Sequence, residues 1–304
     1  MTRLQANLLL TFTAIIWGST FVVQQIGLGE LGPITFTASR FLLGALVVLP
    51  LALRQLHRVA HGVRPLRLND LLWIWLTGLV LFLAAVLQQV GILHTSVTNS
   101  GFLTALYVPL VPLIALLALR HRVHWSVWPA ATACLIGTWL LGGGDRLSLS
   151  SGDLWVIASA LFWAVHVLLV GYVVVRTQAP LVVAATQFLV VGTLGMLVGA
   201  IAESPQPAHF ISAVYGILYA GLLSVGLGFT IQVIGQRYTE PADAAIILSS
   251  ETLFAAIGGL LLLGERLSLI QVAGAALILT GILAVQLAPL FNGSEKPAAT
   301  VVPE

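Results

Sequence analysis

The chain has 304 residues, of which 59% are hydrophobic and 8% charged, whereas about 25% of a soluble domain is charged. A water-soluble fold of this length cannot hide so much apolar side chain, and the continuous apolar runs exclude a transmembrane barrel, whose strands alternate. The net charge of +2 provides no strong field for nucleic acid, so we expect no nucleic-acid partner. The composition therefore indicates a polytopic membrane protein.

Ten apolar runs follow one another along the chain, and each is close to the roughly 20 residues that a membrane-spanning helix needs. The predicted spans cover residues 5–28, 33–53, 70–93, 98–119, 126–142, 153–175, 180–202, 211–235, 241–263 and 268–288. Pro33, Pro180 and Pro241 stand at predicted helix starts, where proline is tolerated because the first amide has no helical partner. The sequence thus predicts an all-α integral membrane protein with ten spans.

Basic residues are distributed unevenly between the two sets of loops that alternate along the chain. One set of loops and both termini contain ten of the 13 Lys and Arg residues, the opposite loops contain two, and Arg40 lies within a span. Because cytoplasmic loops carry the excess of basic residues, we expect both termini in the cytoplasm. The basic loop at residues 54–67 is expected to contact lipid headgroups.

The second half of the chain repeats features of the first half. Matched residues, separated by 143 to 147 positions, are Trp17 and Trp163, Pro33 and Pro180, Arg40 and Gln187, and Gln89 and Gln232. Each half has five spans, and since five is odd the second half is inverted relative to the first. We therefore expect two inverted five-helix repeats at 1–142 and 150–288, followed by a short cytoplasmic tail at 289–304.

Several segments resemble the signatures of the drug/metabolite transporter superfamily, in its ten-helix EamA-like branch. Residues 17–21 and 33–41 resemble the first-half signature, and residues 250–255, 263–268 and 271–274 resemble the second-half signature. The resemblance extends over about residues 5–288 and implies a central cavity, alternating access and a bacterial inner-membrane location. The family often has proline where this chain has Thr252, so a weaker helix break is expected there.

Two charged residues within spans are candidates for substrate binding, because an ionised group inside the membrane is costly unless it is used. Glu251, near the middle of the ninth span, is expected to contact a substrate amine or exchange a proton; the alternative is a structural hydrogen bond. Arg40 has the guanidinium geometry to bind a substrate carboxylate, and the alternative is that it snorkels to the nearer interface.

Aromatic and polar residues also recur at helical spacing in the first and sixth spans. Trp17 and its counterpart Trp163 lie too deep for an interfacial belt, so we expect them to line the cavity rather than only pack between helices. The other predicted lining residues are Thr20, Phe21, Gln24, Tyr107, His166 and Tyr219. For His166 the alternative is a packing histidine.

The expected function is secondary transport of a small metabolite by alternating access. Rings, one acid and one cation suit a zwitterion with an apolar side chain, so we expect export of amino acids, bulky or aromatic ones favoured; this step partly follows family analogy. The alternatives are export of lipophilic cations, nucleotide-sugar transport, a passive channel, or an intramembrane enzyme using Ser159 or Ser224 with His166. We expect a functional monomer in contact with membrane lipid, and predict no catalytic residue, metal site or cofactor.

Overall fold

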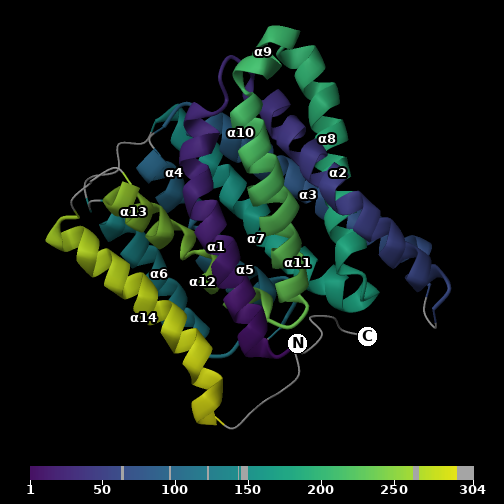
Figure 1. Cartoon of the computed structure of the whole chain (residues 1–304). Coiled ribbons are helices and arrows are strands. Elements are labelled where there is room, and N and C mark those ends of the chain that lie inside the picture. The colour runs from purple at the N-terminus through teal and green to yellow at the C-terminus, as the bar shows by residue number, and fades with distance from the viewer. Residues whose placement is uncertain are drawn as a thin grey trace.

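The computed structural model describes residues 1–62, 65–95, 97–121, 123–142, 144, 150–262 and 267–292. All regular secondary structure in these residues is helical (Figure 1). Eight helical segments of the described chain are long and apolar enough to cross a membrane, and Val127–Leu141 is a shorter apolar helix. The protein is therefore an all-helical, multi-pass membrane protein.

Seven of the predicted spans are each one helix in the described part of the chain. They are α1 (Arg3–Ile26), α2 (Pro33–Ala60), α3 (Leu68–Ile92), α6 (Val127–Leu141), α7 (Ser151–Thr177), α8 (Pro180–Ala202) and α14 (Leu269–Asn292). Helix α2 continues to Ala60. The predicted end at 53 was too early, because the last two turns of the helix are largely basic and polar and do not continue the apolar run. Helix α14 runs into the predicted tail, of which residues 293–304 lie outside the described residues.

The other three spans are interrupted. The fourth consists of α4 (Val97–Thr104) and α5 (Tyr107–Leu117), and the ninth of α12 (Pro241–Leu248) and α13 (Glu251–Leu262). The eighth consists of α10 (Val214–Tyr219), the π-helix η1 (Ala220–Phe229) and α11 (Thr230–Gln236), preceded by the short helix α9 (Pro207–Ser212). Irregular backbone at membrane depth is tolerated where it is buried in protein or lines a cavity.

The inverted repeat is visible in contacts that recur at opposite ends of the helix bundle. Gln55, near the end of α2, accepts hydrogen bonds of 2.8 and 3.1 Å from backbone N–H groups in the first turn of α8. Glu203, just after α8, accepts two bonds of 2.8 Å from backbone N–H groups in the first turn of α2. Each helix thus caps the other, as an inverted two-fold relation requires.

A second reciprocal pair links α1 and α7 to the segments that precede the interrupted spans. The hydroxyl of Thr239 donates to Asn7 Oδ1 at 2.9 Å, and the hydroxyl of Thr95 donates to Asp153 Oδ1 at 2.5 Å. We call the end of the bundle that contains Asn7 the Arg3 end, and the end that contains Asp153 the Glu203 end. In Figure 1 the Arg3 end lies near the label N, and the Glu203 end lies near α9.

The two repeats pack against each other along their length, α2 on α8, α3 on α7 and α6 on α14. Glycine allows close approach in the last of these pairs, because a Cβ atom added to Gly137 of α6 would lie 2.7 Å from the carbonyl oxygen of Gly274 on α14. Figure 1 shows α6 and α14 side by side at one edge of the molecule. Small residues therefore serve helix packing here.

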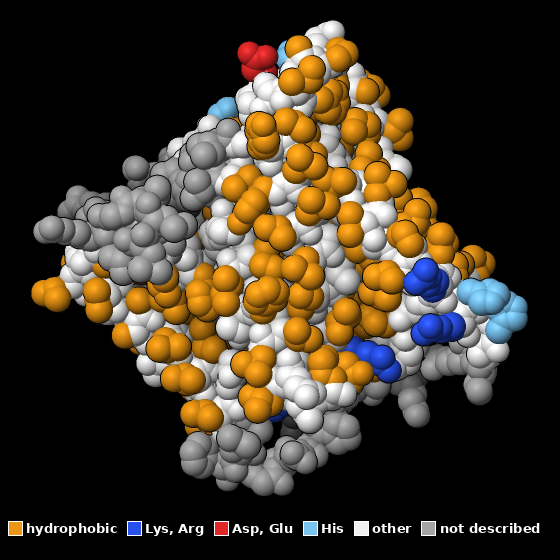
Figure 2. Space-filling view, viewed as in Figure 1, with side chains coloured by type: hydrophobic (Ala, Val, Ile, Leu, Met, Phe, Trp, Pro, Cys, Tyr) orange, Lys and Arg blue, Asp and Glu red, His pale blue; other side chains and the backbone are white. Residues whose placement is uncertain are grey.

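The outer surface is apolar along the bundle and basic at one of its ends. Figure 2 shows hydrophobic side chains over the visible flank, and basic side chains gathered at the end of α2. Large apolar residues such as Ile201 and Leu269 are 86% and 89% exposed, which in water would favour aggregation. A lipid environment removes that penalty, in agreement with a multi-pass membrane protein.

Candidate functional site

A cavity lies between the helices of the bundle, with walls from both repeats. Eight of the ten sequence-predicted residues line it, namely Trp17, Thr20, Phe21, Gln24, Arg40, Tyr107, Trp163 and Glu251. The remaining lining residues are Gln88, Thr104, Val167, Ser224, Phe229, Gln232 and Leu248. The structure thus gathers residues that lie up to 234 positions apart in the sequence into a single cavity.

One wall of the cavity is a group of three aromatic rings. The ring of Phe229 lies 4.5 Å from that of Trp17 and 5.9 Å from that of Trp163, centroid to centroid, and is stacked on Trp163 at an interplanar angle of 18°. The two repeat-related tryptophans therefore flank Phe229, which has no aromatic counterpart in the first repeat. Sequence reasoning missed Phe229, because no pattern distinguishes it from the other phenylalanines of an apolar chain.

The π-helix η1 holds Trp17 in place. The indole N–H of Trp17 donates to the carbonyl oxygen of Ser224 at 3.3 Å. A π-helix has a wider turn than an α-helix and often occurs at functional sites. Gly228 leaves room for this indole, because a Cβ atom at position 228 would lie 2.8 Å from Trp17 Nε1. A polar contact and a glycine thus orient the ring at the cavity wall.

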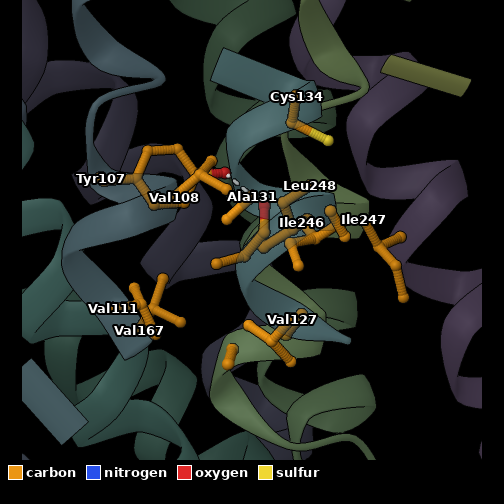
Figure 3. Close-up of a cluster of buried hydrophobic side chains, with 14 of the residues drawn as sticks. Tyr107, Val108, Val111, Val127, Ala131, Cys134, Val167, Ile246, Ile247 and Leu248 are labelled. Carbon is orange, nitrogen blue, oxygen red and sulfur yellow. Dashed lines mark hydrogen bonds between the residues drawn. The ribbon is translucent and has the colours of Figure 1, made fainter. Parts of the chain in front are cut away.

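The break in the fourth span places Tyr107 at the start of α5. Pro109 has no N–H, so the carbonyl of Ala105 cannot accept the usual bond from four residues on and instead accepts one from Val108 at 3.0 Å. The Tyr107 hydroxyl donates to the carbonyl of Ala245 at 3.2 Å, which ties α5 to α12. Figure 3 shows Tyr107 and Val108 at the buried cluster that α5 forms with α6 and α12.

The ninth span breaks as well, although Thr252 stands where the family often has proline. The hydroxyls of Ser249, Ser250 and Thr252 donate to carbonyls three residues earlier, at 2.7, 2.6 and 2.9 Å. Such side-chain bonds compete with the α-helical ladder. The interruption therefore rests on three hydroxyl groups, and it places Glu251 at the first position of α13.

Helix α13 begins in direct contact with α1. A Cβ atom added to Gly18 would lie 2.6 Å from the carbonyl oxygen of Glu251 and 2.9 Å from the backbone nitrogen of Ala255. Both distances are shorter than any normal contact, so only glycine allows this approach. Gly18 of the first-half signature thus determines how closely the start of α13 approaches α1.

The cavity contains one guanidinium and one carboxylate. Arg40 is 3% exposed and Glu251 is 6% exposed, so Arg40 does not snorkel to an interface. The ion pairs in the described part of the chain, Arg3–Asp243 and Arg176–Asp70, involve neither of them. The Nε atom of Arg40 has no hydrogen-bond partner among the described residues, and its guanidinium lies 5.4 Å from the ring centroid of Phe41. Such groups are suited to bind a ligand of opposite charge.

Amide side chains complete the polar part of the site. Gln88 Nε2 donates to the Thr104 hydroxyl at 2.9 Å, and Gln89 Nε2 donates to the carbonyl of Gln24 at 2.9 Å. Gln232 Nε2 donates to a neighbouring glutamine, while its Oε1 atom has no partner among the described residues. The amides thus serve helix packing and also present hydrogen-bonding groups near the rings.

Two predicted residues lie outside the cavity. His166 is fully buried and hydrogen-bonds through Nε2 to Gln187 Oε1 at 2.9 Å. Trp163 and Val167 of the same helix line the cavity, whereas the imidazole of His166 is turned toward Gln187 of α8. Tyr219 shares a hydrogen bond of 2.7 Å with Ser19 at an exposed position.

Comparison with known proteins agrees with this architecture. The model of a family described as the EamA-like transporter family matches residues 4–143 and again residues 150–287. An uncharacterized transporter of Archaeoglobus fulgidus is 28% identical over 285 residues, which cover 94% of this chain and 87% of that protein. The uncharacterized transporter YwfM of Bacillus subtilis is 28% identical over 304 residues, covering 93% and 94%. A crystal structure of a protein with 20% identity superposes with a TM-score of 0.76 and covers 96% of this chain and all of that one, which shows a shared fold.

Proposed function

The chain belongs to the EamA-like transporter family, and from this premise we propose that it exports amino acids with bulky or aromatic side chains. One observation carries the proposal: a wall of three rings lies in the same cavity as one guanidinium and one carboxylate. An aromatic amino acid presents the matching set of a ring, a carboxylate and an ammonium group. Ring stacking and charge-assisted hydrogen bonds would then act on one molecule.

Arg40 and Glu251 have complementary roles in this proposal. Arg40 binds the substrate carboxylate, and Glu251 accepts hydrogen bonds from the ammonium group. Burying a charge without a partner is costly, so a zwitterion that supplies both counter-charges is favoured over a neutral solute.

The proposal includes an orientation and an assembly state. The excess of basic residues in alternate loops supports a cytoplasmic position for both termini and for the Arg3 end of the bundle. The proposed location is the inner membrane of a bacterium. Both repeats belong to one chain and both contribute to the cavity wall, which supports a functional monomer.

Uptake of labelled phenylalanine into proteoliposomes, compared with empty liposomes, tests the proposal. We expect saturable uptake, and a KM raised about tenfold by Trp163→Ala, since a stacked ring contributes about 0.5–1.5 kcal/mol beyond its buried area. Trp155→Ala is the matched control, because Trp155 lies two turns earlier on α7 and is 46% exposed. Absence of saturable phenylalanine and tryptophan uptake would reject this substrate class.

Export of a lipophilic cation is the second candidate, because Glu251 and the three rings could also hold a cation. Arg40 distinguishes the two functions, since a buried guanidinium repels a cation and attracts a carboxylate. We expect Arg40→Gln to abolish phenylalanine uptake, with Arg54→Gln at the exposed end of α2 as control. Cation transport that is retained or improved in Arg40→Gln would favour the second candidate.

A further inference from the structure

At the centre of the cavity, each repeat contributes two lining residues at corresponding positions. Trp17 and its counterpart Trp163, 146 positions later, both line it, and so do Phe21 and its counterpart Val167. These four residues belong to α1 and α7, the first helices of the two repeats. Since the repeats are inverted, α1 continues from this layer toward the Glu203 end, whereas α7 continues toward the Arg3 end.

Beyond this central layer the symmetry is lost. Thr20 and Arg40 line the cavity, and the corresponding residues of the second repeat are His166 and Gln187. Both of these are 0% exposed and neither lines the cavity. The cavity therefore extends from the centre toward the Glu203 end, and the equivalent space toward the Arg3 end is closed.

The closed space toward the Arg3 end is occupied by a polar pair, His166 and Gln187, in which two hydrogen-bonding groups have no partner among the described residues. His166 Nε2 and Gln187 Oε1 are 2.9 Å apart, so a neutral imidazole donates from Nε2 to the amide oxygen. His166 Nδ1 and Gln187 Nε2 have no partner among the described residues. The pair thus offers one acceptor and one donor group, and burying both without partners costs free energy in this arrangement.

Two rings separate this pair from the cavity. The ring of His166 lies 5.8 Å from that of Trp163 at 80°, and 6.4 Å from that of Phe229 at 70°. Both Trp163 and Phe229 line the cavity on their other side. His166 thus packs against two rings that line the cavity.

We propose that His166 and Gln187 form a second binding subsite, which is exposed when the repeats exchange arrangements and the cavity opens at the Arg3 end. The repeats have the same fold, so exchanging their conformations produces a related state with the opposite access. The ligand is a small zwitterion, whose carboxylate accepts from Gln187 Nε2 and whose ammonium group donates to His166 Nδ1. This inference rests on the proposed transport function.

The subsite differs from its counterpart in charge. Arg40 is a cation, whereas Gln187 is a neutral amide that makes weaker hydrogen bonds to a carboxylate. Binding of the zwitterion is therefore expected to be tighter when the cavity opens at the Glu203 end than when it opens at the Arg3 end. The two membrane faces should consequently show different KM values for one substrate.

Labelling of single cysteines tests the subsite without a known substrate. In a Cys134→Ala background, H166C, Q187C and T20C are reconstituted into vesicles sorted by orientation and treated with a membrane-impermeant maleimide. We expect H166C and Q187C to react only from the side that the Arg3 end faces, and T20C only from the opposite side. V183C is the matched control, because Val183 is fully buried on α8 one turn before Gln187 and should stay unreactive.

The outcomes separate this proposal from the proposed function. If T20C reacts but neither H166C nor Q187C reacts from either side, the subsite is rejected, even when phenylalanine uptake is observed. If H166C and Q187C react as expected but phenylalanine is not transported, the subsite stands and the substrate is wrong. Use of two positions in different helices guards against the failure of one variant to fold.

Discussion

At the residue scale, polar and aromatic side chains deep in a span could be recognised from the sequence. Trp17, Arg40 and Glu251 are costly or unusual at that depth, and all three line the cavity. Phe229 and Leu248 also line it, but an apolar residue in an apolar helix carries no such signal. Their position depends on which residues of distant helices face them.

Gly18 provides a prediction at this scale. Gly18→Ala places a Cβ atom 2.6 Å from the Glu251 carbonyl oxygen, so α13 must move away from α1. Displacing a binding group by about 1 Å can cost up to about 100-fold in rate, and we expect transport to fall at least tenfold. Gly101→Ala is the control, because its Cβ atom meets Thr252 at an ordinary 3.6 Å. Equal transport by both variants would contradict the role of Gly18.

At the element scale, the interrupted spans decide where the site lies. The fourth span breaks because Pro109 lacks an N–H, and a proline can be read directly from the sequence. The ninth span breaks through three hydroxyl groups, and serine and threonine hydroxyls alone do not predict a break, because they also occur within continuous helices. The π-helix η1 has no sequence signature at all. Element boundaries thus followed from the sequence where proline acts, and required the structure elsewhere.

Pro109→Ala tests the break in the fourth span. The new N–H can bond to the Ala105 carbonyl, which favours a continuous helix and turns Tyr107 away from its partner on α12. We expect a higher melting temperature and transport reduced by about tenfold or more. Pro112→Ala is the control, since this proline lies within α5, beyond the break. Reduced transport in the control alone would show that the break is not required.

At the scale of the whole molecule, different contacts join the two repeats at the two ends of the bundle. At the Arg3 end, Arg3 pairs with Asp243 at 2.5 Å, and Arg176 pairs with Asp70 at 2.6 Å. At the Glu203 end, Glu203 accepts bonds from the first turn of α2 and from the Thr35 hydroxyl at 2.6 Å. Opening of the Arg3 end requires its two ion pairs to break.

Weakening the contacts between the repeats at one end should therefore favour the arrangement in which the cavity opens at that end. We expect Asp243→Asn to raise the maleimide reactivity of Q187C about two- to fivefold, as loss of a partly exposed ion pair allows, and to lower that of T20C. Glu203→Gln should act in the opposite direction, because it weakens the other end. Parallel changes at both reporter positions would instead indicate general loosening of the fold.

The sequence by itself determined the membrane class, the ten spans, the inverted repeat and most of the polar and aromatic lining, since hydropathy and internal repetition are properties of local residue order. The tertiary structure alone decided that Phe229 completes the ring wall, that His166 is covered rather than exposed, and that the cavity extends toward the Glu203 end. These features depend on contacts between residues from separate helices and on the rotation of single side chains. A pattern that is symmetric in sequence is therefore asymmetric in space, because the cavity extends toward the Glu203 end and not toward the Arg3 end.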